Sequence, residues 1–429
     1  MREMKDSGVT WIGEIPDKWN LLPVKRFFRA EKRIVGDAVN EYERLALTMK
    51  GVIKRSKDDN EGLQPEKFEG YQILRENELV FKLIDLENVK TSRVGLSPYT
   101  GLVSPAYIVL SNRKKDNRFY YYWFLCMYYT EVFNQLGGAG VRSALTAKDV
   151  CLLPVPTTDE DEQTRIADYL DDKCSKIDTI IAKQEKIIEK IKTYKMSLIS
   201  ETVLAGLHAN VPLQYSGHEF IGSIPATWTV LRLRNIGIPQ NGISKGGEFF
   251  GYGYPFVSYG DVYRNFTLPS SVTGLIDSTE EERDKYSVKE GDIFFTRTSE
   301  TIDEVGFSCV CENTIENATF AGFLIRVRPK NETLLRGYAK YYFRGNHLRK
   351  YLVKEMNLVT RASLGQDLLK SMPVLIPPKE EQKEIADFLD KKCALIDSQI
   401  AKREQLVNKL TEYKKSLIYE CVTGKKEIV

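Results

Sequence analysis

The sequence predicts an α+β fold in which two α/β domains are separated by two long helices that pair as an antiparallel coiled coil within the chain. The first observation is an internal repeat: the segment Gln163–Val203 returns without a gap from Gln382, with 22 of its 41 positions identical. The second is that the opening Ser7–Trp19 returns in part as Ser216–Trp228, while the stretches between the copies differ much more. A duplicated frame with a pseudo-twofold axis and two divergent inserts indicates a molecule that recognises two different things at one fixed separation.

The repeat divides the chain into four segments. We expect a first α/β domain over residues 1–157, a central spacer helix over 158–208, a second α/β domain over 209–377 and a C-terminal spacer helix over 378–429. A chain of 429 residues is long enough for two or three domains, each with its own core.

The two spacer segments are predicted to be helical because they contain no internal proline or glycine and carry apolar residues at alternating spacings of three and four. Proline-bearing stretches, Pro154–Pro156 and Pro373–Pro378, precede them, where a helix cannot yet have begun. The predicted coiled-coil seam consists of Leu170, Ile177, Ile181, Ile188, Ile191 and Leu198, then Leu389, Ile396, Ile400, Val407, Leu410 and Leu417.

Polar residues interrupt the seam at equivalent places in the two copies. Gln184 and Lys195 do so in the first copy, and Arg403 and Lys414 in the second. A polar residue in a seam costs stability but specifies register and partner. Alternatively, a long Lys or Arg side chain reaches past the seam to solvent. The sequence leaves both interpretations open.

The segments outside the spacers have a mixed α/β pattern. Ala106–Leu110, Gly291–Thr296 and Gly322–Val327 are predicted strands. The aromatic-rich stretches Arg118–Val132 and Arg336–Val353 are predicted helices. They are related, because Tyr-Trp-Phe at 122–124 corresponds to Tyr-Tyr-Phe at 341–343.

Composition indicates a cytoplasmic protein without a membrane contact. The 62 basic and 59 acidic residues nearly cancel, which neither indicates nor excludes nucleic-acid binding. The N-terminus is polar, and the most apolar run, Phe119–Tyr129, is about half of the roughly 20 residues that a membrane span needs. Seven cysteines without a pairing pattern favour a reducing compartment.

No catalytic, cofactor or metal site is found in the sequence. There is no phosphate-binding G-x-x-x-x-G-K-[ST] loop, no Gly-rich dinucleotide turn and no tetrapeptide of the adenine-methylase type. The pair Cys309 and Cys311 has no second pair to complete a zinc site, so we expect buried, uncharged thiols there.

Basic and hydroxyl-bearing residues cluster in both variable domains. Arg and Lys can contact guanine edges, and Ser and Thr can reach phosphates or bases. For any one cluster, a solvated loop is the simpler interpretation. Because the clusters recur at related positions of the two domains, DNA binding is favoured as strongly as a solvated loop. The candidate DNA-binding residues are Lys50, Lys54, Arg55, Lys82, Arg142 and Ser143 in the first domain, and Ser258, Tyr259, Arg264, Arg297, Thr298, Ser299, Arg361 and Ser363 in the second.

The chain resembles the specificity subunits of type I restriction-modification systems over nearly its whole length. The resemblance rests on the opening Ile12–Trp19 with its repeat, on Gly101–Tyr107, on Gly291–Thr298, and on the proline-then-Glu-Gln entry to each long helix. It implies two target-recognition domains, each reading one half of an interrupted, non-palindromic target in double-stranded DNA. It also implies that this chain is not an enzyme.

The resemblance further implies partners and cofactors. Two adenine-N6 methyltransferase subunits are expected to bind this chain, and restriction and translocase subunits to join them. The chain itself is expected to bind no cofactor, because S-adenosylmethionine, ATP and Mg²⁺ belong to the partner subunits. Two other classes remain: a scaffold whose coiled coil separates two protein-binding domains, and a nuclease with an unrecognised active site.

Overall fold

The chain forms two compact units, each of which contains one end of each long helix. The computed structural model describes residues 2–49, 51–59, 67–84, 86, 93–112, 116–136, 144–299, 305–355 and 362–429. Unit 1 comprises Met1–Glu185 with Gln405–Val429, and unit 2 comprises Lys186–Glu404. Each unit is therefore described by itself.

Unit 1 contains two four-stranded sheets, ordered β6-β5-β10-β7 and β4-β11-β8-β9, and two small ribbons, β1-β2 and β12-β3. Its strands are β1 (Met4–Asp6), β2 (Glu14–Pro16), β3 (Asn20–Pro23), β4 (Arg29–Ala30), β5 (Arg44–Thr48), β6 (Gly51–Arg55), β7 (Gln72–Leu74), β8 (Leu79–Lys82), β9 (Arg93–Leu96), β10 (Gly101–Val103), β11 (Ile108–Ser111) and β12 (Pro154–Thr157). Its shorter helices are η1 (Val24–Arg26), η2 (Gly36–Glu41), α1 (Arg118–Tyr129), α2 (Val132–Leu136) and α3 (Ala147–Leu152).

The core of unit 1 lies between α1 and the sheet that contains β8. Trp123 and Phe124 of α1 are fully buried, and the Phe124 ring packs edge-on against Phe81 of β8 at 4.9 Å. This helix is apolar on most sides, which is typical of a helix surrounded by protein. Trp19 lies in the same core, and its indole Nε1 donates a hydrogen bond of 2.9 Å to Glu162 at the start of the first long helix.

Unit 2 repeats this architecture. Its sheet β16-β23-β19-β21 has the order and the antiparallel pairing of β4-β11-β8-β9 in unit 1, and β18-β17-β22 forms a smaller sheet. Its strands are β13 (Leu213–Tyr215), β14 (Ser223–Pro225), β15 (Thr229–Arg232), β16 (Gly237–Asn241), β17 (Phe250–Val257), β18 (Leu275–Ile276), β19 (Ile293–Thr296), β20 (Thr298–Ser299), β21 (Ser308–Val310), β22 (Thr319–Phe320), β23 (Leu324–Pro329), β24 (Ala362–Ser363) and β25 (Pro373–Ile376). Its shorter helices are α5 (Leu233–Ile236), η3 (Gly247–Phe249), α6 (Tyr259–Arg264), α7 (Glu280–Lys285), α8 (Arg336–Tyr342), α9 (Asn346–Glu355) and α10 (Gln366–Ser371).

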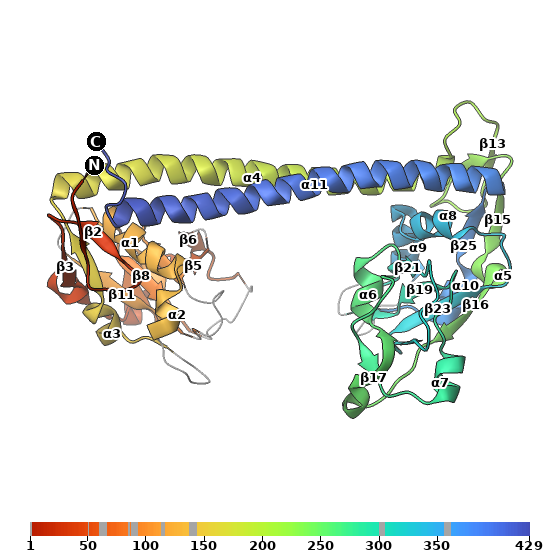
Figure 1. Cartoon of the computed structure of the whole chain (residues 1–429), viewed down its shortest axis with the longest axis horizontal. Helices are drawn as coiled ribbons and strands as arrows, with labels where there is room; N and C mark the ends of the chain where they lie inside the picture. The colour runs from red at the N-terminus through yellow and green to blue at the C-terminus, as the bar shows by residue number, and fades with distance from the viewer. Residues whose placement is uncertain are drawn as a thin grey trace. The chain divides into compact units, whose positions relative to one another are not determined.

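The long helices are α4 (Glu160–Ala205) and α11 (Lys379–Val422), and Figure 1 labels both. Each starts with acidic residues in its first turn, which the positive end of a helix dipole stabilises. They pair antiparallel in both units: Lys414 contacts Asp178 in unit 1, and Lys195 contacts Asp397 in unit 2. The predicted α+β fold with an antiparallel helix pair is confirmed.

The structure places the predicted seam residues along the helix pair. Three of the six in each helix are buried, and the others are half-buried. The buried residues are Leu170, Ile177, Ile188, Leu389, Ile400 and Leu417. At the polar positions, Lys195 and Lys414 lie 15% and 17% exposed and reach carboxylates of the facing helix at 2.7 and 2.6 Å. Each of these lysines therefore extends past the seam and forms an ion pair with an aspartate of the facing helix.

The described helices include none that is both long enough and apolar enough to cross a membrane.

Candidate nucleic-acid interface

In unit 2 the structure brings two of the predicted clusters together at the end of strand β19. The backbone N–H of Arg297 donates to the carbonyl of Phe323 at 2.9 Å, and its carbonyl accepts from the N–H of Leu364 at 2.7 Å. The two-residue strands β20 and β24 then pair, with Thr298 opposite Ser363. Thr298 and Ser363 thus lie opposite each other, and Arg297 directly precedes them on backbone that these hydrogen bonds fix. The Ser299 backbone belongs to β20, and Arg361 lies outside the described residues.

The third cluster of unit 2 adjoins the same place. The N–H of Ala321 donates to the carbonyl of Val257 at 3.0 Å, which joins the end of β17 to the segment that leads to Phe323. Ser258 follows Val257 and caps helix α6: its hydroxyl accepts from the backbone N–H of Asp261 at 3.3 Å and donates to the Asp261 carboxylate at 2.7 Å. This serine therefore has a structural role that any DNA contact would share.

Helix α6 carries the two other predicted residues of that cluster. The Tyr259 ring stacks on Tyr263 with centroids 5.9 Å apart, and Arg264 is exposed at the end of the helix. The three predicted clusters of unit 2 therefore converge on one part of its surface.

Unit 1 has the same junction with different residues. The N–H of Leu145 donates to the carbonyl of Leu83 at 3.1 Å, and Ile84 bridges Ala144, as Leu364 and Ser363 do beyond β19. Lys82, the last residue of β8, is half-buried at this junction. Lys50, Arg142 and Ser143 lie outside the described residues.

The remaining predicted cations of unit 1 lie on the hairpin β5–β6. Lys54 contacts Glu43 at 2.5 Å and lies 5.2 Å from the centre of the Tyr99 ring. The hydrogen bond to Glu43 raises the pKa of Lys54, so this exposed amine is charged at neutral pH. Arg55 donates to Asp59 at 2.6 Å. Both side chains thus have carboxylate neighbours that a phosphate contact would have to compete with.

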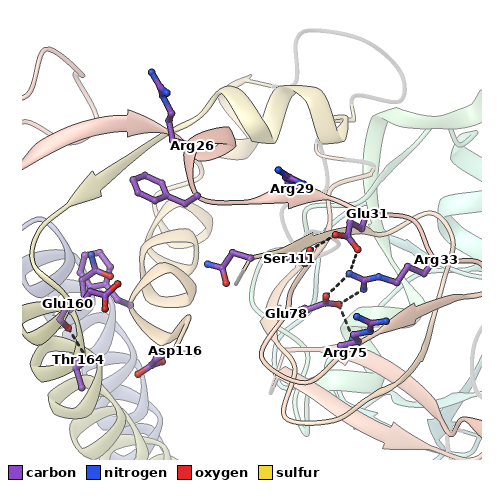
Figure 2. Close-up of a pocket in the computed structure, with 14 residues that line it drawn as sticks. Arg26, Arg29, Glu31, Arg33, Arg75, Glu78, Ser111, Asp116, Glu160 and Thr164 are labelled. Carbon is purple, nitrogen blue, oxygen red and sulfur yellow. Dashed lines mark hydrogen bonds and ion pairs between the residues drawn. The ribbon is translucent and has the colours of Figure 1, made fainter. Parts of the chain in front are cut away.

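A polar pocket of about 1030 Å³ in unit 1 was not predicted from the sequence. Figure 2 shows Glu160 and Thr164 of α4 on one side of it and Arg33 with two carboxylates on the other. Arg33 bonds to Glu78 at 2.9 Å and also to Glu31. The hydroxyl of Ser111 and then Arg33 lower the pKa of Glu31 despite partial burial.

Three further arginines line this pocket: Arg26, Arg29 and Arg75. All three are exposed, and within the described part of the chain no ion pair is found for them. Glu78 immediately precedes strand β8 and Lys82 ends it, so the pocket and the predicted interface lie at opposite ends of that strand. The basic run from Lys25 to Arg33 is the sequence signal that could have indicated this pocket.

The cysteine pair of unit 2 is buried, as expected. Cys309 and Cys311 are fully buried, and burial raises the pKa of each thiol to about 12. Such thiols are uncharged at neutral pH, whereas a metal needs the thiolate. A search of the described residues finds no cluster of His, Cys, Asp and Glu that could hold a metal ion.

The two repeated units, each with a matching backbone junction beyond its central strand and each closed by the long helices, define a duplicated two-domain protein. Comparison with known proteins shows which family part of the chain resembles. Residues 225–409 match the family described as "Type I restriction modification DNA specificity domain". Over these residues the chain is similar to the type I restriction-modification specificity subunits.

The individual relatives are distant. The chain is 24% identical to the "Type I restriction enzyme EcoKI specificity subunit" of Escherichia coli (strain K12), over 67% of this chain and 61% of that one. It is 28% identical to the "Putative type I restriction enzyme MjaX specificity subunit" of Methanocaldococcus jannaschii, over 44% of each. The matches thus span less than two thirds of these curated relatives.

A solved structure supports the fold. A chain from a study described as "Structural basis underlying complex assembly and conformational transition of the type I R-M system" superposes with a TM-score of 0.67. The likeness covers 95% of this chain and 98% of the other, at 15% sequence identity. At that identity the superposition supports the fold alone.

Proposed function

We propose that this chain is the DNA-recognising, non-catalytic subunit of a type I restriction-modification complex. Unit 1 would read one half of an interrupted target in double-stranded DNA, and unit 2 the other half. The observation that carries this proposal is the repeated junction: both units have the same backbone connection beyond the central strand, with Arg297, Thr298 and Ser363 in one and Leu83, Ile84 and Ala144 in the other.

The difference between the two junctions supports a non-palindromic target. Identical backbone presents different side chains, and base identity is read by side-chain contacts to base edges. Two equal half-sites would require equal contacts. The helix pair would act as the spacer that fixes the number of unread base pairs between the half-sites, as dimer geometry does in other DNA-binding proteins.

The repeated helices also support two equivalent partner sites. Since α4 and α11 carry matching sequence over 41 positions, a surface that binds a methyltransferase subunit on one has a counterpart on the other. We propose two adenine-N6 methyltransferase subunits, with restriction and translocase subunits added to them in the cytoplasm. S-adenosylmethionine, ATP and Mg²⁺ would be bound by those partners and not by this chain.

Genome-wide mapping of N6-methyladenine, in cells with and without this chain, tests the proposal. We expect methylation at one bipartite motif, present only with the chain. Methylation that persists without it would contradict the assignment. The purified chain with DNA and Mg²⁺ should leave the DNA intact, whereas cleavage would indicate a nuclease.

DNA binding measured against salt separates the proposal from a protein scaffold. Phosphate contacts release counterions, so the affinity of the assembled complex should fall steeply as salt rises. A scaffold that binds only proteins would show no such association with DNA.

A further inference from the structure

Strand β17 of unit 2 holds an aromatic bulge that none of the predicted clusters includes. Phe250 and Tyr254 both lie opposite Ile276 of β18, so the three residues between them are displaced from the ladder. Gly251 and Gly253 have φ angles of 98° and 91°, in the left-handed region that favours glycine. The two glycines therefore fix the bulge that carries Phe250.

Gly253 is also required by space. A Cβ atom at this position would lie 2.6 Å from the backbone carbonyl oxygen of Ile276, closer than real contacts allow. The ring of Phe250 packs edge-on against Phe256 with centroids 5.2 Å apart, and Phe250 remains 39% exposed. The bulge is thus a rigid feature with an aromatic side chain held at the surface.

An apolar pocket of about 240 Å³ lies beside Phe250. Ile243, Phe256 and Ala321 are buried residues of its lining, and Phe323, 65% exposed, adjoins it. Pockets for small-molecule ligands usually measure about 300–1,000 Å³, so this one suits a smaller group. Its lining suits an apolar group, and its volume leaves ample room for a methyl group.

The pocket is electrically neutral although a lysine lines it. The amine of Lys245 donates to the Glu282 carboxylate at 2.6 Å and to the carbonyl of Asp277 at 2.8 Å. Its charge is therefore already paired within the unit. An anionic ligand gains little there, and an apolar one is not repelled.

Cations and hydroxyls border the pocket on the side of the candidate interface. Phe323 is the residue whose carbonyl accepts from Arg297, and Ser258 and Tyr259 line the pocket directly. DNA that contacts Arg297 through a phosphate or a base edge would place neighbouring base pairs against Phe323. Among base-pair edges in the major groove, the thymine C5-methyl group is the apolar one.

We infer that this pocket takes the thymine methyl group of an A·T pair in the half-site that unit 2 reads, with Phe323 and Phe250 as specificity-determining residues. The inference rests on the proposed function. It commits to DNA because a neutral, apolar, preformed pocket adjoins the backbone junction that carries Arg297, Thr298 and Ser363.

The test replaces each thymine of that half-site in turn by deoxyuridine, which lacks only the methyl group. The assembled complex should bind one of these DNAs about fourfold more weakly, the effect of removing one buried methyl group at about 0.8 kcal/mol. The variant Phe323→Ala should bind the thymine DNA more weakly and lose this sensitivity to deoxyuridine. Fluorescence anisotropy of labelled DNA measures both.

The matched control is Ile238→Ala, since Ile238 is 63% exposed on β16 of the same unit and does not line the pocket. It should keep the wild-type response to deoxyuridine. Because Phe323 is itself largely exposed, its replacement is not expected to unfold unit 2, and unchanged hydrogen exchange in peptides from β19 and β23 checks this.

Four outcomes overturn the inference. They are equal affinity for every deoxyuridine DNA, undiminished deoxyuridine sensitivity in Phe323→Ala, a half-site without A·T pairs, and a Phe323→Ala defect confined to assembly with protein partners. All four are measured with a complex that still binds DNA. Failure of the proposed function is different, because the complex would then show no sequence-dependent binding at either half-site.

Discussion

The buried histidine of unit 2 predicts a specific loss of stability in mild acid. His347 of helix α9 is 3% exposed, and its ring lies 4.9 Å from that of Tyr342. Within the described part of the chain, neither ring nitrogen has a hydrogen-bond partner. Burial lowers the pKa of His347 to about 3, because the charged ring would lose its hydration without compensation. The folded protein therefore keeps this histidine neutral at all moderate pH values.

The direction in which pH changes the free energy of unfolding follows from the two pKa values of His347. An unfolded histidine has a pKa of about 6.5, so the unfolded state binds a proton below that pH while the folded state does not until about pH 3. The contribution to the free energy of unfolding is complete above pH 6.5 and is lost as the pH falls. Between pH 7 and pH 5 the loss is about 2 kcal/mol, since each pH unit well below 6.5 costs about 1.4 kcal/mol.

Hydrogen exchange in peptides from β19 and β23 measures this loss within unit 2, after correction for the intrinsic effect of pH on exchange. Wild-type opening should become roughly thirtyfold more favourable from pH 7 to pH 5 through this residue. His347→Leu should lack that component, and the difference between the two proteins cancels the contributions of the exposed His208 and the half-buried His218. An identical pH dependence in both proteins would refute the reasoning.

Three further predictions concern recognition and spacing. Arg297→Ala should weaken binding by about 1–3 kcal/mol for the half-site of unit 2 only, measured with DNAs altered in one half at a time, and an equal loss at both halves would indicate a folding defect. Inserting one heptad between residues 185 and 186 and another between 404 and 405 lengthens each long helix by about 10 Å. Methylation mapping should then find the gap between the half-sites longer by about three base pairs and both half-sites unchanged. An altered half-site would contradict the spacer role. The pair Lys195–Asp397 should show a coupling of about 0.5 kcal/mol in a double-mutant cycle, small because Asp397 is 56% exposed, and a value that does not fall with salt would argue against an ion pair.

Much of the fold was predictable because its signals are local. The helix period of the spacers, the absence of proline and glycine, and the proline-bearing entries all lie within the helices or next to them. The predicted strands at 106–110, 291–296 and 322–327 correspond to β11, β19 and β23 with shifts of about two residues. The second aromatic helix is divided into α8 and α9 at Gly345, where a Cβ atom would lie 2.5 Å from the ring of His347.

The candidate site was predictable only as separate clusters. Arg297 and Ser363 are brought together by two-residue strands far apart in the sequence, and such short segments have no periodicity to detect. The apolar pocket depends on the bulge at Gly251–Gly253 and on Phe323, which the sequence presents as unrelated segments. The position of the site residues therefore depends on tertiary pairing, whereas the long helices and main strands follow from local sequence pattern.

The contacts between each unit and the ends of the long helices explain why the interface can differ between the units without disturbing the fold. In unit 1, Trp19 donates to Glu162 at the start of α4 and lies beside Gly424, just after α11. In unit 2, Trp228 donates to Glu381 at the start of α11 at 2.8 Å and lies beside Gly206, just after α4. Each unit is thus closed by the beginning of one long helix and the end of the other.

Both closing glycines have positive φ angles, and a Cβ atom at either would lie 3.2 Å from its tryptophan ring. The side chains that close the units are therefore remote in sequence from Arg297, Phe323 and the other residues of the interface. Substitutions in the interface leave the closing contacts intact, whereas a substitution at either glycine affects the unit it closes. A protein built this way can change what each unit recognises while the helices that join the units stay the same.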